Sequence, residues 1–388
     1  MQTPINLIAT AAFGIEAVVK RECTALGFNN ISVQDGRTYF TGDIASIPKA
    51  NLWLRSADRV LLNMGQFTTL TFDELFEGTK ALPWADWIPQ NGKFTVLAKS
   101  VRSTLFSLSD IQSIVKKSVV EKLKQTYNVN TFPEDGPEYT IEAALLKDTV
   151  TLTIDTTGHR NGLFKRGYRK DSATAPLKET MAAALISLSY WKPGRILLDP
   201  TCGSGTIAIE AALMAKNIAP GLSRTFVCEK WPQIPPDVWK DARKEAYAKI
   251  DINMEETILF GSDIDPSVIE LAQKNAEQAG VDDIIRFEHK PLNEVTLPDK
   301  YGICISNPPY GERIGQMQEV HKLYEDMGKL LSDPTWSAYV LTSDEFFESA
   351  FGVNHKKKRA DAKRKLFNGN IKTDYYQYYG DRPKKEDR

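Results

Sequence analysis

The apolar residues near the N-terminus recur at two different periods, which predicts a mixture of helices and strands. Helical spacing over residues 17–26 ends at Gly27, and glycine readily adopts the left-handed conformation that closes a helix. A short strand over 37–40 and a second helix around 52–54 follow. Together these elements predict a small α+β unit that spans residues 1–65.

Strict alternation of apolar and polar residues is typical of half-buried strands, and it marks a second unit over residues 66–160. Three stretches alternate in this way: residues 94–98, 139–145 and 150–154. Between the first two, Ser109 and Gln112 have the spacing of a capping box, so a helix is expected to begin at Ser109. The unit ends in a connector over residues 158–170 that is rich in glycine and basic residues.

After residue 170 the pattern changes to short apolar runs separated by helical stretches. The runs that we expect to form strands cover residues 195–198, 258–260, 284–285, 303–305 and 338–341. Alternating strands and helices produce parallel sheets with helices on both faces, so an α/β fold is expected here. Two closing strands are expected on either side of a turn at Asn368-Gly369.

Residues 217–257 form an insertion between the first and second strands of this α/β part. The insertion is rich in proline and contains Trp231 and Trp239. These tryptophans, like Trp84 and Trp87 before them, are expected in a core or an interface rather than as platforms for bases, because large aromatic side chains are usually buried.

Composition indicates a folded protein with neither a membrane span nor a metal site. Of 388 residues, 42% are hydrophobic and 26% are charged, which is close to the globular average and excludes a wholly disordered chain. The formal net charge of -1 does not indicate a nucleic-acid binder, so such an activity must come from local patches. No stretch approaches ~18 consecutive apolar residues, and the N-terminus has no secretory signal pattern. The four cysteines form no Cys-x-x-Cys pair, which predicts no zinc site and no disulfide framework and fits a cytoplasmic location.

A glycine-rich loop, residues 199–206, follows the first strand of the α/β part. Ligands of open parallel sheets bind at the carboxyl ends of strands, and the glycines let a ligand approach the backbone. The same spacing fits a dinucleotide fingerprint, and a tight turn without a ligand is the plainer interpretation. Against a dinucleotide, Asp263 after the second strand lies far beyond the expected ~20-residue spacing. Asp199 would also repel a pyrophosphate, whereas it could receive the amino group of an amino-acid-like cofactor.

Two carboxylates follow the second strand, in Asp263-Ile264-Asp265. Asp263 can accept hydrogen bonds from both hydroxyls of a ribose. Asp265 precedes Pro266, a pair that is typical of a helix N-terminus, so Asp265 is at least as well explained as a cap.

The tetrapeptide Asn307-Pro308-Pro309-Tyr310 directly follows the fourth strand and presents acceptors rather than donors. Two consecutive prolines remove two backbone N–H groups and stiffen the chain. The Asn307 side-chain oxygen, the Pro308 carbonyl and the Tyr310 ring therefore suit a planar base with an exocyclic amine. A rigid turn is the alternative, but the glycine loop at the same sheet edge favours a binding site.

Three motifs, in this order, resemble those of class I S-adenosylmethionine-dependent methyltransferases that act on amino nitrogens: residues 199–205, 261–263 and 307–310. More extended stretches resemble the bacterial THUMP-containing 23S rRNA guanine-N2 methyltransferases: residues 11–27, 165–169, 175–180 and 307–314. The resemblance implies a ferredoxin-like unit over 1–65, a THUMP RNA-binding domain over 66–160 and a Rossmann-like methyltransferase domain over 161–388. We expect one modification only, because the chain ends before the second methyltransferase domain that some of these relatives carry.

The resemblance also implies a cofactor, S-adenosylmethionine, and a set of site residues. Asn307, Pro308, Pro309 and Tyr310 would be catalytic. The cofactor-binding residues would be Leu177, Lys178, Glu179, Thr180, Asp199, Pro200, Thr201, Cys202, Gly203, Ser204, Gly205, Thr206, Asp263, Ile264, Asn293 and Asn307. The chain departs from the usual pattern after its third strand, where residues 289–293 contain no carboxylate to read the adenine amino group. Adenine recognition is therefore assigned to backbone groups or to Asn293.

The expected partner is 23S rRNA or a precursor of the large ribosomal subunit, with the exocyclic N2 amine of a guanine as acceptor. Basic residues at 355–359 and 363–365 could neutralise phosphates, or they could form a solvated surface. The alternatives are a tRNA guanine-N2 methyltransferase, a DNA adenine-N6 methyltransferase, a dehydrogenase and a non-catalytic RNA-binding protein. The sequence leaves the modified nucleotide and the oligomeric state open.

Overall fold

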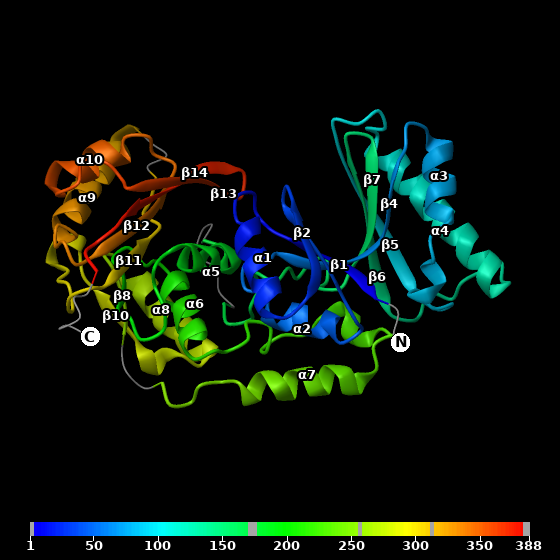
Figure 1. The fold of residues 1–388 in the computed structure, drawn as a ribbon, viewed down its shortest axis with the longest axis horizontal. Coiled ribbons are helices and arrows are strands. Elements are labelled where there is room, and N and C mark those ends of the chain that lie inside the picture. Colours follow the sequence, from blue (N-terminus) through cyan, green and yellow to red (C-terminus); the bar gives the residue numbers. More distant parts are fainter. Residues whose placement is uncertain (1–3, 170–176, 255–257, 311–313, 383–388) are drawn as a thin grey trace. The chain divides into compact units, whose positions relative to one another are not determined.

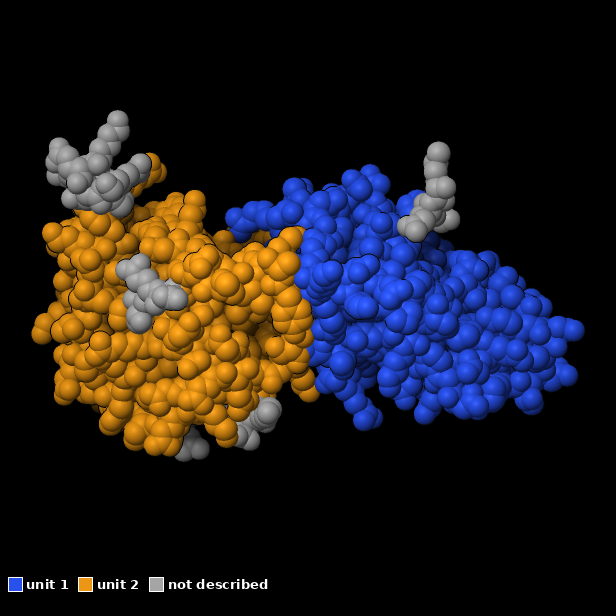
Figure 2. All heavy atoms as spheres, turned by 90° about the horizontal axis from the view of Figure 1, so that it is seen from below, with its two compact units in different colours: residues 1–11, 20–163, 224–245 blue, residues 12–19, 164–223, 246–388 orange. Residues whose placement is uncertain are grey.

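The computed structural model describes residues 4–169, 177–254, 258–310 and 314–382 (Figure 1). The chain folds into two compact units, each of which draws on separate stretches of sequence (Figure 2). Unit 1 comprises residues 1–11, 20–163 and 224–245, and unit 2 comprises residues 12–19, 164–223 and 246–388. Each unit is built on a seven-stranded sheet.

The sheet of unit 1 joins both of the expected N-terminal units through one long strand. From edge to edge its strands are β2 (Asn29–Gln34), β3 (Arg37–Gly42), β1 (Ile5–Thr10), β4 (Arg59–Thr68), β7 (Thr149–Asp155), β6 (Glu138–Leu146) and β5 (Lys93–Val101). The three alternating stretches lie within β5, β6 and β7, as predicted. Strand β4 pairs with β1 on one side and with β7 on the other, so residue 65 lies inside a strand of one continuous sheet.

The helices of the N-terminal half are α1 (Glu16–Ala25), α2 (Ser46–Trp53), α3 (Phe72–Lys80) and α4 (Leu108–Tyr127). The chain leaves α1 through Gly27, whose φ of +78° is the expected left-handed conformation. The expected start of α4 at Ser109 is wrong. Ser107 has the extended backbone of an N-cap and Ser109 already lies inside the helix. A capping box occurs instead at α3, between Thr71 and Glu74.

The insertion after β8 (Leu197–Asp199), which includes α7 (Pro236–Ala248), contributes side chains to the core of unit 1. Trp231 is 1% exposed, and its ring stacks on that of Tyr139 with centroids 4.7 Å apart. The Trp231 indole also donates to the Glu138 carbonyl oxygen at 3.0 Å. Trp84, Trp231 and Trp239 are buried, which confirms that they are core residues. Trp87 is only partly buried, and its ring meets that of Trp231 edge to face.

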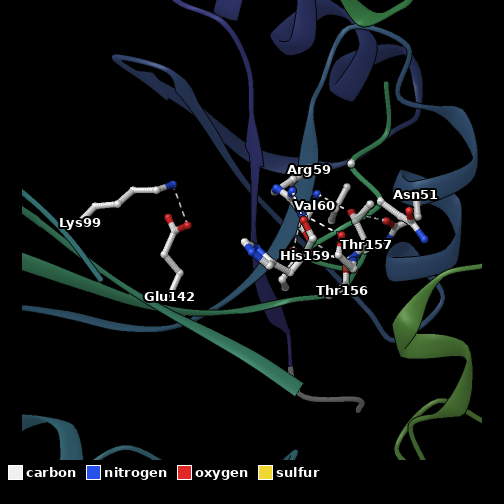
Figure 3. Close-up of polar contacts among 12 residues, drawn as sticks. Asn51, Arg59, Val60, Lys99, Glu142, Thr156, Thr157 and His159 are labelled. Carbon is white, nitrogen blue, oxygen red and sulfur yellow. Dashed lines mark hydrogen bonds and ion pairs between the residues drawn. The ribbon is translucent and has the colours of Figure 1, made fainter. Parts of the chain in front are cut away.

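A buried polar network fixes the chain where β7 ends (Figure 3). Asn51 of α2 donates to Thr156 Oγ1 at 2.9 Å and accepts from the Thr157 hydroxyl at 2.8 Å. Nearby, Arg59 pairs with Asp155 at 2.6 Å. Because buried polar groups cost free energy unless they are paired, these contacts hold the chain firmly as it leaves the sheet.

The sheet of unit 2 is the α/β sheet that the strand–helix pattern predicts. From edge to edge its strands are β10 (Ile285–His289), β9 (Leu259–Asp263), β8, β11 (Ile303–Ser306), β12 (Ser337–Thr342), β14 (Ile371–Tyr378) and β13 (Ala362–Asn368). The first five are parallel, and β13 and β14 form an antiparallel hairpin. The predicted hairpin is confirmed, but its turn is at Gly369-Asn370, one residue after the expected position, because Asn368 still pairs with Ile371.

Helices cover both faces of this sheet (Figure 1). They are α5 (Glu179–Leu188), α6 (Thr206–Ala215) and α8 (Pro266–Ala279) on one face, and α9 (Ile314–Leu330) and α10 (Phe347–Asn354) on the other. The hydroxyl of Tyr375 in β14 donates to the Leu185 carbonyl oxygen in α5 at 3.0 Å. Its neighbour Tyr376 packs on the opposite face with Phe347 and Tyr324. Every helix within the described ranges is too short or too polar to cross a bilayer.

Candidate active site

The strand order of unit 2 brings the two sequence motifs to one edge of the sheet. The chain passes from β8 outward to β9 and β10 and then returns to β11 on the other side of β8. Such a reversal opens a crevice at the carboxyl ends of the central strands. The glycine loop follows β8 and the Asn-Pro-Pro-Tyr tetrapeptide follows β11, so both lie at the edge of the sheet where ligands of such folds bind.

The glycine loop needs its two glycines for different reasons. Gly205 is the N-cap of α6 with φ +78°, and a Cβ there would lie 2.7 Å from the Phe287 ring. Gly203 has φ +51°, and a Cβ there would meet nothing within 4 Å among the described residues. Close packing therefore requires Gly205, whereas the backbone at Gly203 faces open space that a ligand can fill.

Asp263, at the end of β9, is bound to the glycine loop. The Gly203 N–H donates to Asp263 Oδ2 at 2.9 Å, and the Asp265 N–H donates to Oδ1 at 3.1 Å. Each carboxylate oxygen keeps a lone pair for a further donor. Asp265 caps α8 by accepting from the Ser267 N–H at 2.8 Å, which confirms its structural role. Ile264 between the two carboxylates is 71% exposed.

Asp199 is an acidic side chain enclosed by the protein. It is 2% exposed, and its pKa is raised to about 7, chiefly by this burial; the Thr201 N–H and the Ser306 hydroxyl oppose the rise, and the nearby charge of Asp263 adds to it. Ser262 Oγ on β9 is also buried and has no hydrogen-bond partner among the described residues. A buried carboxylate beside an open glycine suits a ligand that carries a positive amino group.

A hydrogen bond joins the glycine loop to the tetrapeptide. The hydroxyls of Thr201 and Ser306 lie 2.6 Å apart, and Ser306 is the residue immediately before Asn307. Sequence reasoning missed Ser306, although its place at the end of β11 and next to Asn307 was a usable signal. The contact brings the expected cofactor loop and the expected base-binding residues into one site.

The tetrapeptide is held by its own side chains and by helix α9. The Tyr310 hydroxyl donates to Asn307 Oδ1 at 2.5 Å. The Tyr324 hydroxyl of α9 lies 3.4 Å from the Pro309 carbonyl oxygen, to which it donates, and 3.0 Å from Thr342 Oγ1. Burial raises the pKa of Tyr310, while a hydrogen bond from the Asn368 side chain opposes the rise. No pattern in the sequence pointed to Tyr324 or Asn368, because both lie far from the motif along the chain.

The residues expected before the first strand lie at the start of α5. Leu177 and Lys178 precede the helix, and Glu179 and Thr180 open it and are buried. Arg169 lies 3.7 Å from Glu179 and donates to Thr206 Oγ1 of the glycine loop at 2.5 Å. Burial raises the pKa of Glu179, and Arg169 opposes the rise.

The connector over 158–170 is therefore partly an internal structure. Arg166 is buried and pairs with Glu210 of α6 at 3.2 Å, and Tyr168 donates to the same carboxylate at 3.3 Å. A buried arginine with a carboxylate partner belongs to the interior of the unit and is not available for RNA; removal of either partner would leave an uncompensated buried charge. Lys170 lies outside the described residues.

Several cations of the basic segment 355–365 also have partners within unit 2. Lys357 pairs with Asp361 at 2.7 Å, and Lys363 pairs with Asp374 at 3.2 Å. Lys358 donates to the Gly352 carbonyl oxygen at 2.5 Å. For these side chains the contacts favour a structural role over a phosphate site.

Asn293 is exposed, in a short 3-10 helix over 292–294 that follows β10. Within the ranges that the structure describes, no group of three or more His, Cys, Asp or Glu side chains is arranged to hold a metal ion. All four cysteines are free thiols and buried.

Family models match three parts of the chain. A model described as "RMKL-like, methyltransferase domain" covers residues 166–377. The chain belongs to this methyltransferase family. Models described as "RlmL ferredoxin-like domain" and "THUMP domain" cover residues 6–61 and 70–155 of this RMKL-like methyltransferase. The expected architecture, with ferredoxin-like, THUMP and Rossmann-like methyltransferase domains, is thereby confirmed.

Two relatives of this RMKL-like methyltransferase bear names of RNA-modifying proteins. A Bacillus subtilis (strain 168) protein named "Putative RNA methyltransferase YpsC" is 50% identical over 377 residues, with 96% of each chain covered. The "Ribosomal RNA large subunit methyltransferase K/L" of Cellvibrio japonicus (strain Ueda107) is 34% identical, with 92% of this chain covered. The chain spans 49% of the length of that K/L protein, so about half of it has no counterpart in the match.

Two solved structures share the fold across nearly the whole chain. A protein from Listeria monocytogenes str. 4b F2365, described as "a predicted N6-adenine-specific DNA methylase", is 48% identical with a TM-score of 0.92 and covers 98% of this chain and 97% of its own. SMU.472, described as "a putative methyltransferase complexed with SAH", is 45% identical with a TM-score of 0.92 and covers 99% of this chain and 100% of its own. The names of these RMKL-like relatives thus differ in the nucleic acid they specify.

Proposed function

We propose that this protein transfers a methyl group from S-adenosylmethionine to the exocyclic N2 amine of a guanine in 23S rRNA. The observation that carries the proposal is the hydrogen bond between Thr201 and Ser306, which joins the glycine loop to Asn307-Pro308-Pro309-Tyr310. A cofactor held by the first motif and an amine held by the second would lie side by side. Positioning of this kind supplies much of the acceleration in a displacement reaction.

The residues around the glycine loop fit S-adenosylmethionine, which supplies an activated methyl group when it is bound. Asp199 is enclosed and acidic, as a partner for an amino group should be. The open backbone at Gly203 leaves room for the methionine part. The Asp263 carboxylate retains lone pairs for ribose hydroxyls while it accepts from two backbone N–H groups.

Asn307 and Pro308 would accept the two N–H bonds of the target amine. By accepting both N–H bonds, they would pull the nitrogen toward tetrahedral geometry, so that its lone pair points out of the plane of the base toward the methyl group. These hydrogen bonds become more favourable as positive charge develops on nitrogen. Asn307 Oδ1 accepts one hydrogen bond from the Tyr310 hydroxyl and keeps its second lone pair for the amine. The Tyr310 ring would stack on the base. The methylated nitrogen would then release its extra proton to solvent, so this arrangement needs no general base and no metal ion.

The choice of RNA is supported by the N-terminal part of the chain. The THUMP match over residues 70–155 and the K/L relative favour rRNA, which would place the protein in the cytoplasm. The name of the Listeria structure favours adenine in DNA instead. Guanine N2 and adenine N6 are both exocyclic amines, so the acceptors at 307–310 suit either base.

Labelled methyl transfer tests the proposal. S-adenosylmethionine would be incubated with the protein and with 23S rRNA, tRNA or DNA from cells that lack it, and the modified nucleosides would be identified. Label in 23S rRNA as N2-methylguanosine is expected. Label in tRNA would mean that the proposed substrate is wrong and the proposed reaction is right. Label only in DNA adenine would mean that both the substrate and the target base are wrong. The Asn307→Ala protein is the negative control.

A further inference from the structure

The β13–β14 hairpin projects beyond the edge of the sheet that carries the active site. Thr342, the last residue of β12, pairs with Asp374 of β14, and the hairpin continues past this pair to its turn at Gly369-Asn370. The active-site motifs follow the carboxyl ends of β8 and β11, which are parallel to β12. The turn therefore extends on the side of the sheet where the motifs lie.

A loop from the N-terminus, residues 12–14, is fastened to this hairpin. The Arg364 guanidinium donates twice to the Gly14 carbonyl oxygen, at 2.7 and 3.1 Å. Gly14 has φ +97°, and a Cβ there would lie 2.8 Å from the Lys365 carbonyl oxygen. Only glycine, which has no Cβ, lets the loop approach β13 so closely, so the loop has a defined position on this strand.

The loop and the hairpin together present two aromatic rings beside a pocket. Phe13 is 51% exposed and meets Phe367 edge to face, with ring centroids 5.8 Å apart. A pocket of about 480 Å³ is lined by Ala12, Phe13, Phe367, Gly369 and Asn370. The Lys365 ammonium lies 5.6 Å from the centre of the Phe367 ring.

The same hairpin contacts the base-binding residues. Asn368, the last residue of β13, hydrogen-bonds to the Tyr310 side chain. Tyr310 in turn donates to Asn307. Asn368 thus links the pocket, which its neighbours Gly369 and Asn370 line, to the side chains of Tyr310 and Asn307 that would hold the target amine.

We propose that Phe13, together with the hairpin residues Phe367 and Asn370, binds an unpaired nucleotide of the RNA that flanks the target base. The proposal rests on the proposed function in that the substrate is a nucleic acid. Phe13 would stack on the flanking base, and the Asn370 amide would contact its edge. Lys365 would lie near a phosphate.

The chemistry of the pocket favours a nucleotide over an apolar protein segment. Single strands are bound by aromatic side chains that stack on bases and by cations that follow the backbone. Phe13 and Phe367 provide the rings, and the exposed ammonium groups of Lys365 and Lys372 lie on the same hairpin. A base that enters an active site must leave the stack of bases in the nucleic acid. The next base along the strand then loses a stacking partner and needs a new one.

Steady-state kinetics with Phe13→Leu and Phe13→Tyr tests the proposal on the full-length protein. Leucine keeps the apolar bulk and removes the ring, whereas tyrosine keeps the ring. With unmodified 23S rRNA as substrate, Phe13→Leu should raise KM by about 5- to 150-fold, as expected for the loss of one base–aromatic stack, with little change in kcat. Phe13→Tyr should resemble the wild type. Binding of S-adenosylhomocysteine and the melting temperature should be unchanged in both variants.

Tyr247, an exposed aromatic residue near the end of α7, provides the matched control, and Tyr247→Leu should not alter KM. An unchanged KM for Phe13→Leu would overturn the stacking site. Equal losses in both Phe13 variants with a lower melting temperature would show that Phe13 acts in packing. If Phe13→Leu raised KM for a precursor ribosomal particle but not for naked RNA, the pocket would contact a protein, and the nucleotide-stacking site would be overturned as well. If the wild type methylates tRNA or DNA, the proposed substrate fails, and the same variants assayed on that acceptor still test the stacking site.

Discussion

The Tyr310 hydroxyl donates a hydrogen bond to Asn307 Oδ1 across 2.5 Å. The Tyr310 hydroxyl also accepts a hydrogen bond from the Asn368 side chain, so its own proton is directed at Asn307, and the carboxamide atom at that position is the oxygen. The bond between Tyr310 and Asn307 also orients the remaining lone pair of that oxygen. Tyr310 therefore has a second role besides the aromatic face that the sequence suggested.

Replacing Asn307 should affect the chemical step far more than cofactor binding. Asn307→Ala removes an acceptor that gains strength as charge develops on the amine, so kcat should fall by about 10²-fold or more. Affinity for S-adenosylhomocysteine, measured by calorimetry, should change little. Equal losses in kcat and in cofactor affinity would assign Asn307 to the cofactor site instead.

Removing only the Tyr310 hydroxyl should separate its two roles. Tyr310→Phe keeps the ring and loses the bond to Asn307, so kcat should fall by about 2- to 10-fold, as for one neutral hydrogen bond. Tyr310→Ala also removes the ring, and its KM for RNA should rise in addition. If the phenylalanine and alanine variants behave alike, the hydroxyl is the essential part and stacking is not.

Cofactor binding should depend on pH through Asp199, whose pKa lies at about 7 in the folded protein. The ionised carboxylate is the form that receives an amino group, so binding of S-adenosylhomocysteine should weaken by up to about tenfold per pH unit below pH 7. Isothermal titration between pH 5.5 and pH 8.5, on the order of one unit per step, would measure this slope. Asp199→Asn should bind more weakly and lose the slope. If Asp199→Asn kept the pH dependence of binding, another titrating group would be responsible for it.

The same carboxyl group should influence stability with the opposite trend. Because the folded-state pKa of Asp199 is raised above its ordinary value of 3.8, its protonated form favours the folded protein. The free energy of unfolding without ligand should therefore decrease as pH rises from about 4 through about 7 and level off above. Asp199→Asn should flatten this part of the curve in denaturant titrations.

The two loop glycines should respond differently to alanine. Gly205 has a left-handed backbone, and Gly205→Ala would place a methyl group there against the Phe287 ring. The variant should therefore have both a lower melting temperature and weaker cofactor binding. Gly203→Ala points its methyl group into open space, so the stability loss should be limited to about 1–2 kcal/mol from the backbone. Affinity for S-adenosylhomocysteine should nevertheless drop strongly. Unchanged affinity in Gly203→Ala would place the ligand elsewhere.

Local patterns predicted the strands and loops that carry the candidate site, because each motif directly follows a buried strand. The sheet edge, the loop at 199–206 and the tetrapeptide at 307–310 were accessible from the sequence for that reason. The contacts that join them were not, since Ser306 with Thr201 and Asn368 with Tyr310 depend on how distant strands pair. The pKa of Asp199 could not be predicted either, because it depends on burial by the folded chain.

The N-terminal half shows the same division between local and long-range information. The capping-box spacing at Ser109 was correct as a pattern but lay inside α4, because Ser107 has the extended backbone of the cap. The alternating strands were predicted, yet their union into one sheet through β4 was not, since pairing of β1 and β7 with the same strand leaves no mark in either sequence.

The contribution of residues 224–245 to unit 1 affects how the protein can be synthesised. Glu138 of β6 and Trp231, whose indole binds it, are 93 residues apart. At ~5–20 residues per second, β6 leaves the ribosome roughly 5–20 s before the tryptophan that covers it. Strand β8 and the glycine loop emerge within this interval, but the strands that pair with β8, β9 and β11, follow Trp231 in the chain, so β8 has no pairing strand until the first core can be completed. The core of unit 1 can therefore be completed before the second sheet begins to pair, although β8 has already been synthesised.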